Sequence, residues 1–144
     1  MDDYFPCISK ARGPAFTKGK EGELWVMLLE KAWAKINGSY DAIESGLTRE
    51  CLHDFTGAPT MTLWLDEEKY ANVVWSKLLE AEKSHYVMTC GSSDSHDDEL
   101  LKKNGIVKSH AYSLLGAFEL KLNNEVHKLV KLRNPWGDAE NSEW

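Results

Sequence analysis

The sequence is poor in features that would assign it to several common classes of protein. Its three cysteines, Cys7, Cys51 and Cys90, are an odd number without a Cys-x-x-Cys pair, which is typical of a reducing cytosol rather than of a disulfide framework. Its 17 basic residues are outnumbered by 23 acidic ones, and this negative charge argues against nucleic acid as a partner. No run approaches the roughly 18 apolar residues of a membrane-spanning helix, and no signal-peptide pattern opens the chain. We therefore expect a cytoplasmic protein without a transmembrane segment.

The residues that are present suffice for one domain or for one lobe of a larger one. The chain has 144 residues, 42% of them hydrophobic, and its six tryptophans suggest a core built with large aromatic rings. Helical patterns come first, strand patterns follow, and no internal repeat is visible. This order predicts an α+β fold in which an antiparallel sheet is accompanied by peripheral helices.

The clearest predicted helix spans residues 23–36, because apolar residues recur there at spacings of three and four. Asn37-Gly38 is expected to end it, since glycine readily adopts the left-handed conformation that follows a helix. The residues that recur at this spacing are Trp25, Leu28, Leu29, Ala32, Trp33 and Ile36.

Further helices are predicted where residues with capping side chains precede helical patterns. The expected caps and helices are Ser39 before 40–45, Thr48 before 49–54 and Asp66 before 67–83. A strand is expected at 85–90, followed by a polar loop at 91–104.

The last part of the chain reads as a β-hairpin with strands at 110–122 and 126–133. The segment between them begins with Asn123-Asn124, and asparagine tolerates the positive φ of a tight turn. A turn centred there places His110 opposite roughly position 137, and a bulge at Gly116 would shift this by one. His110 and Asn134 are therefore predicted to emerge at the same end of one sheet, a few residues out of register.

A histidine beside an asparagine is the arrangement that a cysteine protease needs next to its thiolate. The imidazole takes and returns a proton, and the asparagine amide oxygen accepts the second ring N–H and fixes the ring orientation. A neighbouring indole, here Trp136, can shield that hydrogen bond from water. Taken alone, His110 at a strand start is more often a structural histidine, and Asn134 before a proline is a plausible turn residue. Their neighbours in the sequence reverse that balance.

The segment His110-Ala111-Tyr112-Ser113 is followed by Leu132-Arg133-Asn134-Pro135-Trp136-Gly137, and the histidine and the asparagine are 24 positions apart. This combination resembles the calpain family of cysteine proteases. Further stretches match that family in the same order along nearly the whole chain. They are Glu23-Leu24-Trp25, residues 29–35, Asn37-Gly38-Ser39-Tyr40 and Asp54-Phe55-Thr56-Gly57. The resemblance is weakest at 1–20 and 92–103.

The resemblance implies a papain-like cysteine protease lobe that carries half of a catalytic site. Residues 1–20 would end the preceding, nucleophile-bearing subdomain with its connecting loop, and residues 21–144 would form the His/Asn-bearing catalytic lobe, truncated at its C-terminus. His110 and Asn134 would be catalytic and Trp136 would pack over them. The nucleophilic cysteine would lie outside this chain, and Cys90 is the least improbable internal candidate.

By the same resemblance, Gly46 and Ser109 match positions that bind the substrate backbone. The family commonly has glycine at the second position, so the Cβ of Ser109 is expected to narrow the specificity pocket. Calcium-activated members bind Ca²⁺ through oxygen ligands, and Glu23 and Glu140 match one ligand each. The alternatives are that Glu23 complements a helix dipole and that Glu140 is a solvated loop acid. Residues 96–99 are expected to form a solvated acidic loop.

The function implied is that of part of an intracellular, calcium-regulated cysteine endopeptidase acting on proteins or peptides. The partner within the same protein would be the missing Cys-bearing subdomain. We expect the isolated chain to be inactive and not to bind Ca²⁺ tightly. The alternative is a catalytically inactive calpain-like binding module. A glutamine followed by a cysteine that opens a helix, encoded upstream, would favour the enzyme.

Overall fold

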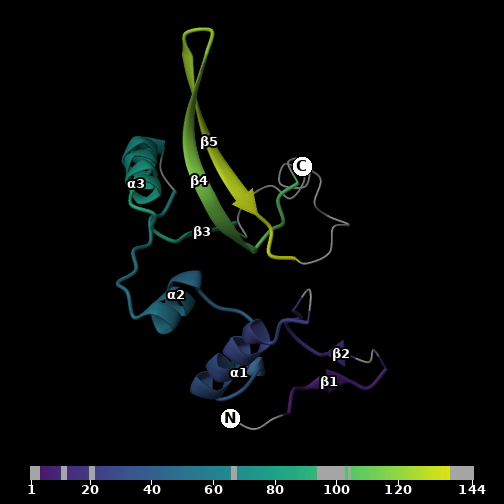
Figure 1. Cartoon of the computed structure of the whole chain (residues 1–144). Helices are drawn as coiled ribbons and strands as arrows, with labels where there is room; N and C mark the ends of the chain where they lie inside the picture. The colour runs from purple at the N-terminus through teal and green to yellow at the C-terminus, as the bar shows by residue number, and fades with distance from the viewer. Residues whose placement is uncertain are drawn as a thin grey trace. The chain divides into compact units, whose positions relative to one another are not determined.

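The computed structural model describes residues 4–10, 13–19, 22–65, 68–93, 103 and 105–136. Within these residues it has helices and antiparallel strands (Figure 1), which confirms the predicted α+β class. Backbone contacts divide the chain into two compact units, residues 1–47 and residues 48–144. This division does not coincide with the boundary predicted near residue 20, and the assignment of residues 1–20 to a preceding subdomain stays a prediction.

The first unit contains two very short paired strands and one long helix. Its elements are β1 (Cys7–Ile8), β2 (Gly13–Pro14), α1 (Trp25–Asn37) and the 3₁₀ turn η1 (Asp41–Ile43). Gly38 follows α1 with a φ of 104°, a conformation that costs glycine little, so the predicted end of the helix is confirmed. The Ser39 hydroxyl accepts a hydrogen bond from Ala42 N–H at 3.1 Å, as a cap should, although the turn is shorter than predicted.

α1 buries a different set of residues from the apolar ones that mark it in the sequence. Its buried residues are Met27, Lys31 and Ala34, whereas Trp25 is 63% exposed and Ile36 is 77% exposed. The spacing of apolar residues shows which of them share a helix face, but packing decides which face is covered. The buried Lys31 ammonium donates to the Tyr4 backbone carbonyl and lies 5.1 Å from the centre of the Phe5 ring. Its charge is therefore partly compensated.

The second unit begins with helices that lead into a sheet. The helical elements are α2 (Thr48–Thr56), the 3₁₀ turn η2 (Glu68–Tyr70) and α3 (Ala71–Lys83). α2 begins at the residue that was predicted to cap it, and the Thr48 hydroxyl forms a 2.8 Å hydrogen bond with the Thr89 hydroxyl. The predicted cap Asp66 lies outside the described residues. Among the described residues, no helix is long and apolar enough to cross a membrane.

The sheet has three antiparallel strands in the order β3-β4-β5. They are β3 (Met88–Gly91), β4 (Ala111–Leu122) and β5 (Glu125–Arg133). Asn123 and Asn124 have φ values of 50° and 63°, which confirms the predicted tight turn between β4 and β5. Glu125 is already the first residue of β5 rather than part of the turn.

A bulge in β4 sets the register at the far end of the hairpin. Gly116 pairs with Lys131, but the next pair is Leu114 with Leu132, so β4 contains one extra residue there. The last pair is Ser113 with Arg133. Three further steps along each strand bring His110 opposite position 136, one residue from the position expected without a bulge.

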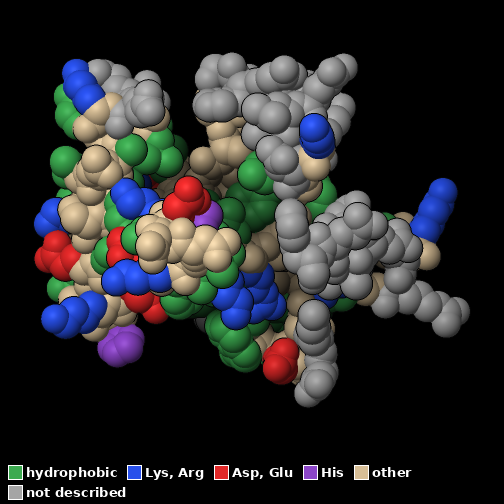
Figure 2. All heavy atoms as spheres, turned by 90° about the horizontal axis from the view of Figure 1, so that it is seen from above, with side chains coloured by type: hydrophobic (Ala, Val, Ile, Leu, Met, Phe, Trp, Pro, Cys, Tyr) green, Lys and Arg blue, Asp and Glu red, His purple; other side chains and the backbone are tan. Residues whose placement is uncertain are grey.

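The sheet is anchored on the side of β4. Its buried side chains, Tyr112, Leu114 and Ala117, all belong to that strand. Two hydrogen bonds connect α3 to the hairpin. The Trp75 indole N–H of α3 donates to Glu119 of β4 at 2.8 Å, and the Lys128 ammonium of β5 donates to Asn72 of α3 at 2.8 Å. Hydrophobic side chains also lie on the surface among charged ones (Figure 2).

Candidate active site

The structure joins His110 and Asn134 directly. His110 immediately precedes β4 and Asn134 immediately follows β5, and the bulged register brings the two strand ends together. The imidazole Nε2 lies 2.8 Å from the Asn134 side-chain Oδ1. The sequence predicted that both residues emerge at one end of the sheet, and the structure adds that their side chains are in hydrogen-bond contact.

The backbone of Trp136 determines how the protons of this pair are arranged. Trp136 N–H donates to Asn134 Oδ1 at 3.1 Å. A backbone amide can only donate, so the amide atom that it faces must be the oxygen. An oxygen that accepts cannot donate to the imidazole, and therefore His110 Nε2 carries a proton. In the neutral ring, Nδ1 then holds the lone pair that can take a proton from a thiol.

Two aromatic rings hold the imidazole from its sides. The Tyr112 and His110 rings are arranged edge to face, with a centroid distance of 4.9 Å and an angle of 83°. The Trp136 indole lies at 4.8 Å and 52°. Tyr112 is buried, whereas Trp136 is 49% exposed. The buried ring thus forms a support from within the sheet, and the half-exposed indole covers the imidazole on the side of the solvent.

Ser109 has a backbone conformation that non-glycine residues rarely adopt. Its φ is 48°, in the left-handed region where a Cβ approaches the carbonyl oxygen and costs roughly 1–2 kcal/mol. The residue is exposed and lies directly before His110. The strained turn therefore presents a serine side chain next to the candidate base. Its predicted contact with substrate stays a prediction.

Ser92 is a site residue that the sequence analysis missed. Its N–H donates to the His110 carbonyl at 2.9 Å, and its hydroxyl accepts from His110 N–H at 3.0 Å. The same hydroxyl lies 2.5 Å from the Val107 carbonyl. Ser92 is 18 positions from His110 in a stretch that was read as loop. The available signal was its position directly after the strand that pairs with the start of β4.

The remaining predicted site residues are not brought to His110 by the described contacts. Gly46 and Glu23 belong to the first unit and are exposed. Glu23 precedes the Leu24 cap of α1 and lies outside its first turn, which weakens the alternative that it only complements the helix dipole. Glu140 and the acidic loop at 96–99 lie outside the described residues.

The two glutamates matched to Ca²⁺ ligands are not joined by further acidic side chains in the described part of the chain. No group of three or more His, Cys, Asp or Glu side chains there is arranged to hold a metal ion. Ca²⁺ takes roughly six to eight oxygen ligands, of which the Glu23 carboxylate offers two oxygens. The Ca²⁺ role of Glu23 and Glu140 stays a prediction.

The cysteines of the second unit do not have the features of an activated nucleophile. All three cysteines of the chain are free. Burial raises the pKa of the Cys90 thiol, and burial together with nearby Asp54 raises the pKa of the Cys51 thiol. A raised pKa keeps both groups protonated near neutral pH, whereas a protease nucleophile needs the thiolate.

The chain matches known proteases along its whole length. A family model described as calpain family cysteine protease matches residues 1–144. The chain is 39% identical over 150 residues to the calpain-type cysteine protease ADL1 of Oryza sativa subsp. japonica, covering 100% of this chain and 7% of that protein. It is 40% identical over 141 residues to calpain-14 of Homo sapiens, covering 97% of this chain and 20% of that protein. A third relative, the calpain-1 catalytic subunit of Mus musculus, is 36% identical over 143 residues, with 97% of this chain and 20% of that protein covered.

These matches cover only a part of each relative. The chain spans 7% of the plant protein and 20% of each of the two animal proteins. The activity of the full-length relatives is therefore only a proposal for this chain.

Proposed function

The chain belongs to the calpain family of cysteine proteases, and we propose that it supplies the general base and the orienting asparagine of a Cys-His-Asn endopeptidase site. The carrying observation is the 2.8 Å hydrogen bond between His110 Nε2 and Asn134 Oδ1. It leaves Nδ1 as the ring nitrogen that receives the proton of a thiol. The nucleophilic cysteine is supplied by another part of the same protein.

The geometry supports a two-stage mechanism in which one imidazole serves as base and then as acid. His110 Nδ1 takes the proton of the cysteine thiol, and the thiolate forms a bond to the carbonyl carbon of the scissile peptide. The protonated imidazole then gives that proton to the departing amine, and the C–N bond breaks to leave a thioester. In the second stage His110 takes a proton from water as its oxygen attacks the thioester carbon. The C–S bond breaks, the carboxylic acid leaves, and the imidazolium returns the proton to the thiolate.

Asn134 and Trp136 keep the imidazole ready for both proton transfers. The Asn134 oxygen accepts Nε2–H in every protonation state of the cycle, so the ring cannot turn Nδ1 away without losing a hydrogen bond. The Trp136 backbone N–H fixes that oxygen at 3.1 Å. The indole beside the imidazole limits the access of water, which strengthens the hydrogen bond.

Residues 1–144 alone are expected to hydrolyse no peptide. The described contacts assign neither an activated thiolate nor donors aimed at an oxyanion, of which one is worth roughly 3–4 kcal/mol of barrier. Addition of the Cys-bearing subdomain should restore turnover where the two parts fold and assemble. A fluorogenic peptide assay of the isolated chain and of its Cys90→Ser variant provides the check. Activity that disappears with Cys90→Ser would place the nucleophile inside the chain.

The substrates that we propose are proteins or peptides. We propose Ser109 in the second unit and Gly46 in the first unit each as a contact to a substrate backbone. At the strained turn before His110, the Ser109 Cβ reduces the space available to a substrate side chain. Ser109→Gly should therefore broaden the accepted residues next to the cleaved bond. A peptide library cleaved by the full-length protein tests this, and an unchanged cleavage profile would remove Ser109 from the specificity pocket.

Calcium regulation and a cytoplasmic location remain part of this proposal. Ca²⁺ would require ligands in addition to Glu23 and Glu140, so we expect no micromolar binding by residues 1–144 in calorimetry. The three free cysteines agree with a reducing compartment. Fractionation of cells that express the protein would test the location.

The decisive test compares two histidines of the same hairpin in the full-length protein. His110→Ala should lower kcat/KM by more than a hundredfold, since general base catalysis typically contributes roughly 10²–10⁴. His127→Ala, on the exposed strand β5, should leave activity unchanged. Comparable activity of both variants would show that His110 is not the base. An upstream sequence with serine, glycine or lysine in place of the cysteine would favour the inactive binding module.

A further inference from the structure

We propose that Ser92 is a positioning residue for His110, acting through its hydroxyl and through the Tyr112 ring. The inference rests on the proposed function of His110 as the general base. Ser92 follows β3, which pairs with the start of β4, and Gly91 lies opposite Ala111. The serine is therefore placed beside the residue that precedes β4.

The first part of the argument is the backbone of His110. Its N–H donates to the Ser92 hydroxyl at 3.0 Å, and its carbonyl accepts from Ser92 N–H at 2.9 Å. Both main-chain polar groups of the histidine are thus held by one serine. The ladder between β4 and β5 ends at Ser113 and Arg133, so on that side of β4 it does not reach His110.

The second part is the path from the same hydroxyl to the imidazole ring. The Ser92 hydroxyl has one hydrogen to donate, and the Val107 carbonyl at 2.5 Å is nearer than the His110 carbonyl at 3.3 Å. Val107 N–H donates in turn to the Tyr112 hydroxyl at 2.7 Å. The centroids of the Tyr112 and His110 rings lie 4.9 Å apart in an edge-to-face contact. Ser92, Val107, Tyr112 and His110 therefore form a closed cycle of contacts.

This cycle matters because His110 follows a strained residue. Ser109 has a φ of 48°, and a turn in that conformation relaxes unless its surroundings hold it. Without the Ser92 hydroxyl, the half-buried His110 N–H loses its acceptor, and the cost of an unpaired amide favours a shift of the backbone. A displacement of about 1 Å at a catalytic group can cost roughly a hundredfold in rate. The hydroxyl of Ser92 thus keeps Nε2 on Asn134 and Nδ1 in place for the thiol.

The first readout is the tautomer of His110 in residues 1–144. Long-range proton–nitrogen spectra of the labelled chain, at about pH 8.5 where histidines are normally neutral, report which ring nitrogen carries the hydrogen. We expect the wild type to show the Nε2–H form and Ser92→Ala to show a mixture of the two forms. Asn134→Ala should show the mixture as well, which validates the readout.

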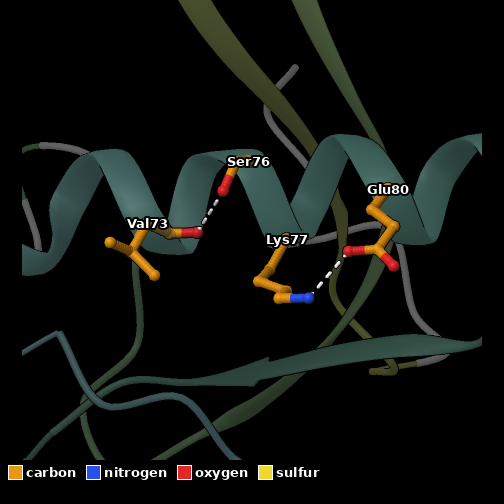
Figure 3. Close-up of polar contacts among 4 residues, drawn as sticks. All are labelled: Val73, Ser76, Lys77 and Glu80. Carbon is orange, nitrogen blue, oxygen red and sulfur yellow. Dashed lines mark hydrogen bonds and ion pairs between the residues drawn. The ribbon is translucent and has the colours of Figure 1, made fainter.

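The second readout is kinetic and uses the full-length protein. Ser92→Ala should lower kcat by about tenfold to hundredfold, with KM within about twofold of the wild type, because transition-state alignment rather than ground-state binding is lost. Ser92→Thr keeps the hydroxyl and should recover most of kcat and the Nε2–H form. The matched control is Ser76→Ala, which removes a hydroxyl that donates to the Val73 carbonyl within α3 at 2.8 Å (Figure 3) and should change neither readout.

Tyr112→Phe provides an independent test of the path through Val107. It removes the hydroxyl that accepts from Val107 N–H and keeps the ring against the imidazole, so it should raise the Nδ1–H fraction less than Ser92→Ala does. Tyr112→Phe also tests the role of Ser92 in the case that Ser92→Ala does not fold. A Tyr112→Phe chain with the unmixed wild-type tautomer would then overturn the proposal.

Three further results would overturn the proposal. One is a folded Ser92→Ala chain that keeps the single Nε2–H form, whatever its kcat. Another is wild-type kcat in Ser92→Ala. The third is a folded Ser92→Thr protein that behaves like Ser92→Ala. Failure of the proposed function is recognised separately, because it requires that His110→Ala retains activity, whereas the tautomer readout needs no catalysis.

Discussion

The two ends of the β4–β5 hairpin are built in different ways. At the end that carries His110, the strand has the buried side chains of Tyr112 and Leu114. At the turn end, Leu122 is 55% exposed and Val126 is 52% exposed, and the strands are joined by the main-chain ladder and the two-residue turn. The ladder alone is sufficient to pair two strands, and the end that carries His110 adds buried side chains to it.

The position of β3 explains this difference. β3 pairs with residues 111–114 of β4, so β4 is a central strand at its start. Among the described residues, no strand pairs with the rest of β4 on that side. Central pairing supplies hydrogen bonds on both sides and brings Ser92 next to His110. The comparison teaches that the two neighbours of β4 contribute differently: the residue after β3 contacts the His110 backbone, and the residues after β5 contact its imidazole.

The largest expected effect at the His110 end, after loss of the histidine itself, is that of Asn134→Ala. We expect kcat in the full-length protein to fall by about tenfold to hundredfold, because the imidazole loses the acceptor that fixes its tautomer but keeps its two aromatic neighbours. Asn72→Ala is the control. Asn72 lies on α3 and accepts a hydrogen bond from Lys128 of β5 at 2.8 Å, and the described contacts do not link it to His110. Equal kcat values for the two variants would contradict the assignment of Asn134.

Trp136→Ala and Trp75→Ala should separate activity from stability. Trp136 is 49% exposed, so its removal should cost less than the roughly 3–5 kcal/mol of a buried tryptophan, while kcat falls by about tenfold as the imidazole loses its cover. Trp75 donates to Glu119 and lies below Lys128, and its removal should lower stability more and activity less. Urea unfolding and a kinetic assay of both variants give the comparison. The opposite pattern would make Trp136 a core residue.

Gly116→Ala tests the bulge that separates the two ends. A Cβ at Gly116 would lie 2.4 Å from the Phe118 ring, which is too close, but Phe118 is 46% exposed and its ring can move away. We expect a loss of about 1 kcal/mol or less in the free energy of unfolding. This is the low end of the roughly 1–3 kcal/mol that extra atoms in a packed core typically cost. In a Phe118→Ala background, Gly116→Ala should cost no further free energy of unfolding, because the ring that would clash is absent. A much larger loss in the single variant would mean that the bulge itself cannot accept a side chain.

The cysteines should show a smaller difference, in reactivity rather than in stability. Burial raises the pKa of the Cys90 thiol, so less thiolate is present at about pH 8 than for an ordinary thiol. Alkylation of Cys90 in the folded chain should therefore be slower than alkylation of the exposed Cys7. Its rate should rise as the pH increases toward the raised pKa. Mass spectrometry of digested samples measures both rates, and faster labelling of Cys90 would reveal an activated thiol next to β4.

The smallest effect is expected for an exposed ion pair away from both ends. Lys77 and Glu80 on α3 are 2.8 Å apart (Figure 3), and Lys77 lowers the pKa of the Glu80 carboxyl. A carboxyl whose pKa is lower in the folded than in the unfolded chain stabilises the fold at pH values above its unfolded pKa. That contribution is lost as the pH falls through its folded pKa. Because both side chains are exposed, Glu80→Gln should unfold in urea like the wild type at pH 7 and at pH 3. A clear difference confined to pH 7 would contradict this.

Much of the second unit could be predicted from neighbouring residues alone. Two asparagines in succession favour positive φ values, and they predicted a tight turn at Asn123-Asn124 between two strands. The second strand begins one residue earlier than predicted, at Glu125. The bulge in β4 was expected within one residue of where it lies. These features follow from local sterics and hydrogen bonding, which a short stretch of sequence carries with it.

Burial and side-chain partners depend on which surfaces meet. The apolar residues of α1 recur at helical spacing, yet Met27, Lys31 and Ala34 are the buried residues, since periodicity does not state which face has a neighbour. Thr48 was assigned to a cap, but its hydroxyl reaches Thr89 in β3. In both cases a contact distant in sequence replaced the local interpretation.

The sequence by itself determined the family, the hairpin, and the arrival of His110 and Asn134 at one end of a sheet. Only the tertiary structure decided that Trp136 N–H orients the Asn134 oxygen, that Nε2 consequently carries the proton, and that Ser92 holds both main-chain groups of His110. The reason is physical. Propensity and periodicity act over a few neighbouring residues, whereas these hydrogen bonds require ångström-scale positions that depend on register, on the bulge and on the pairing of β3 with β4.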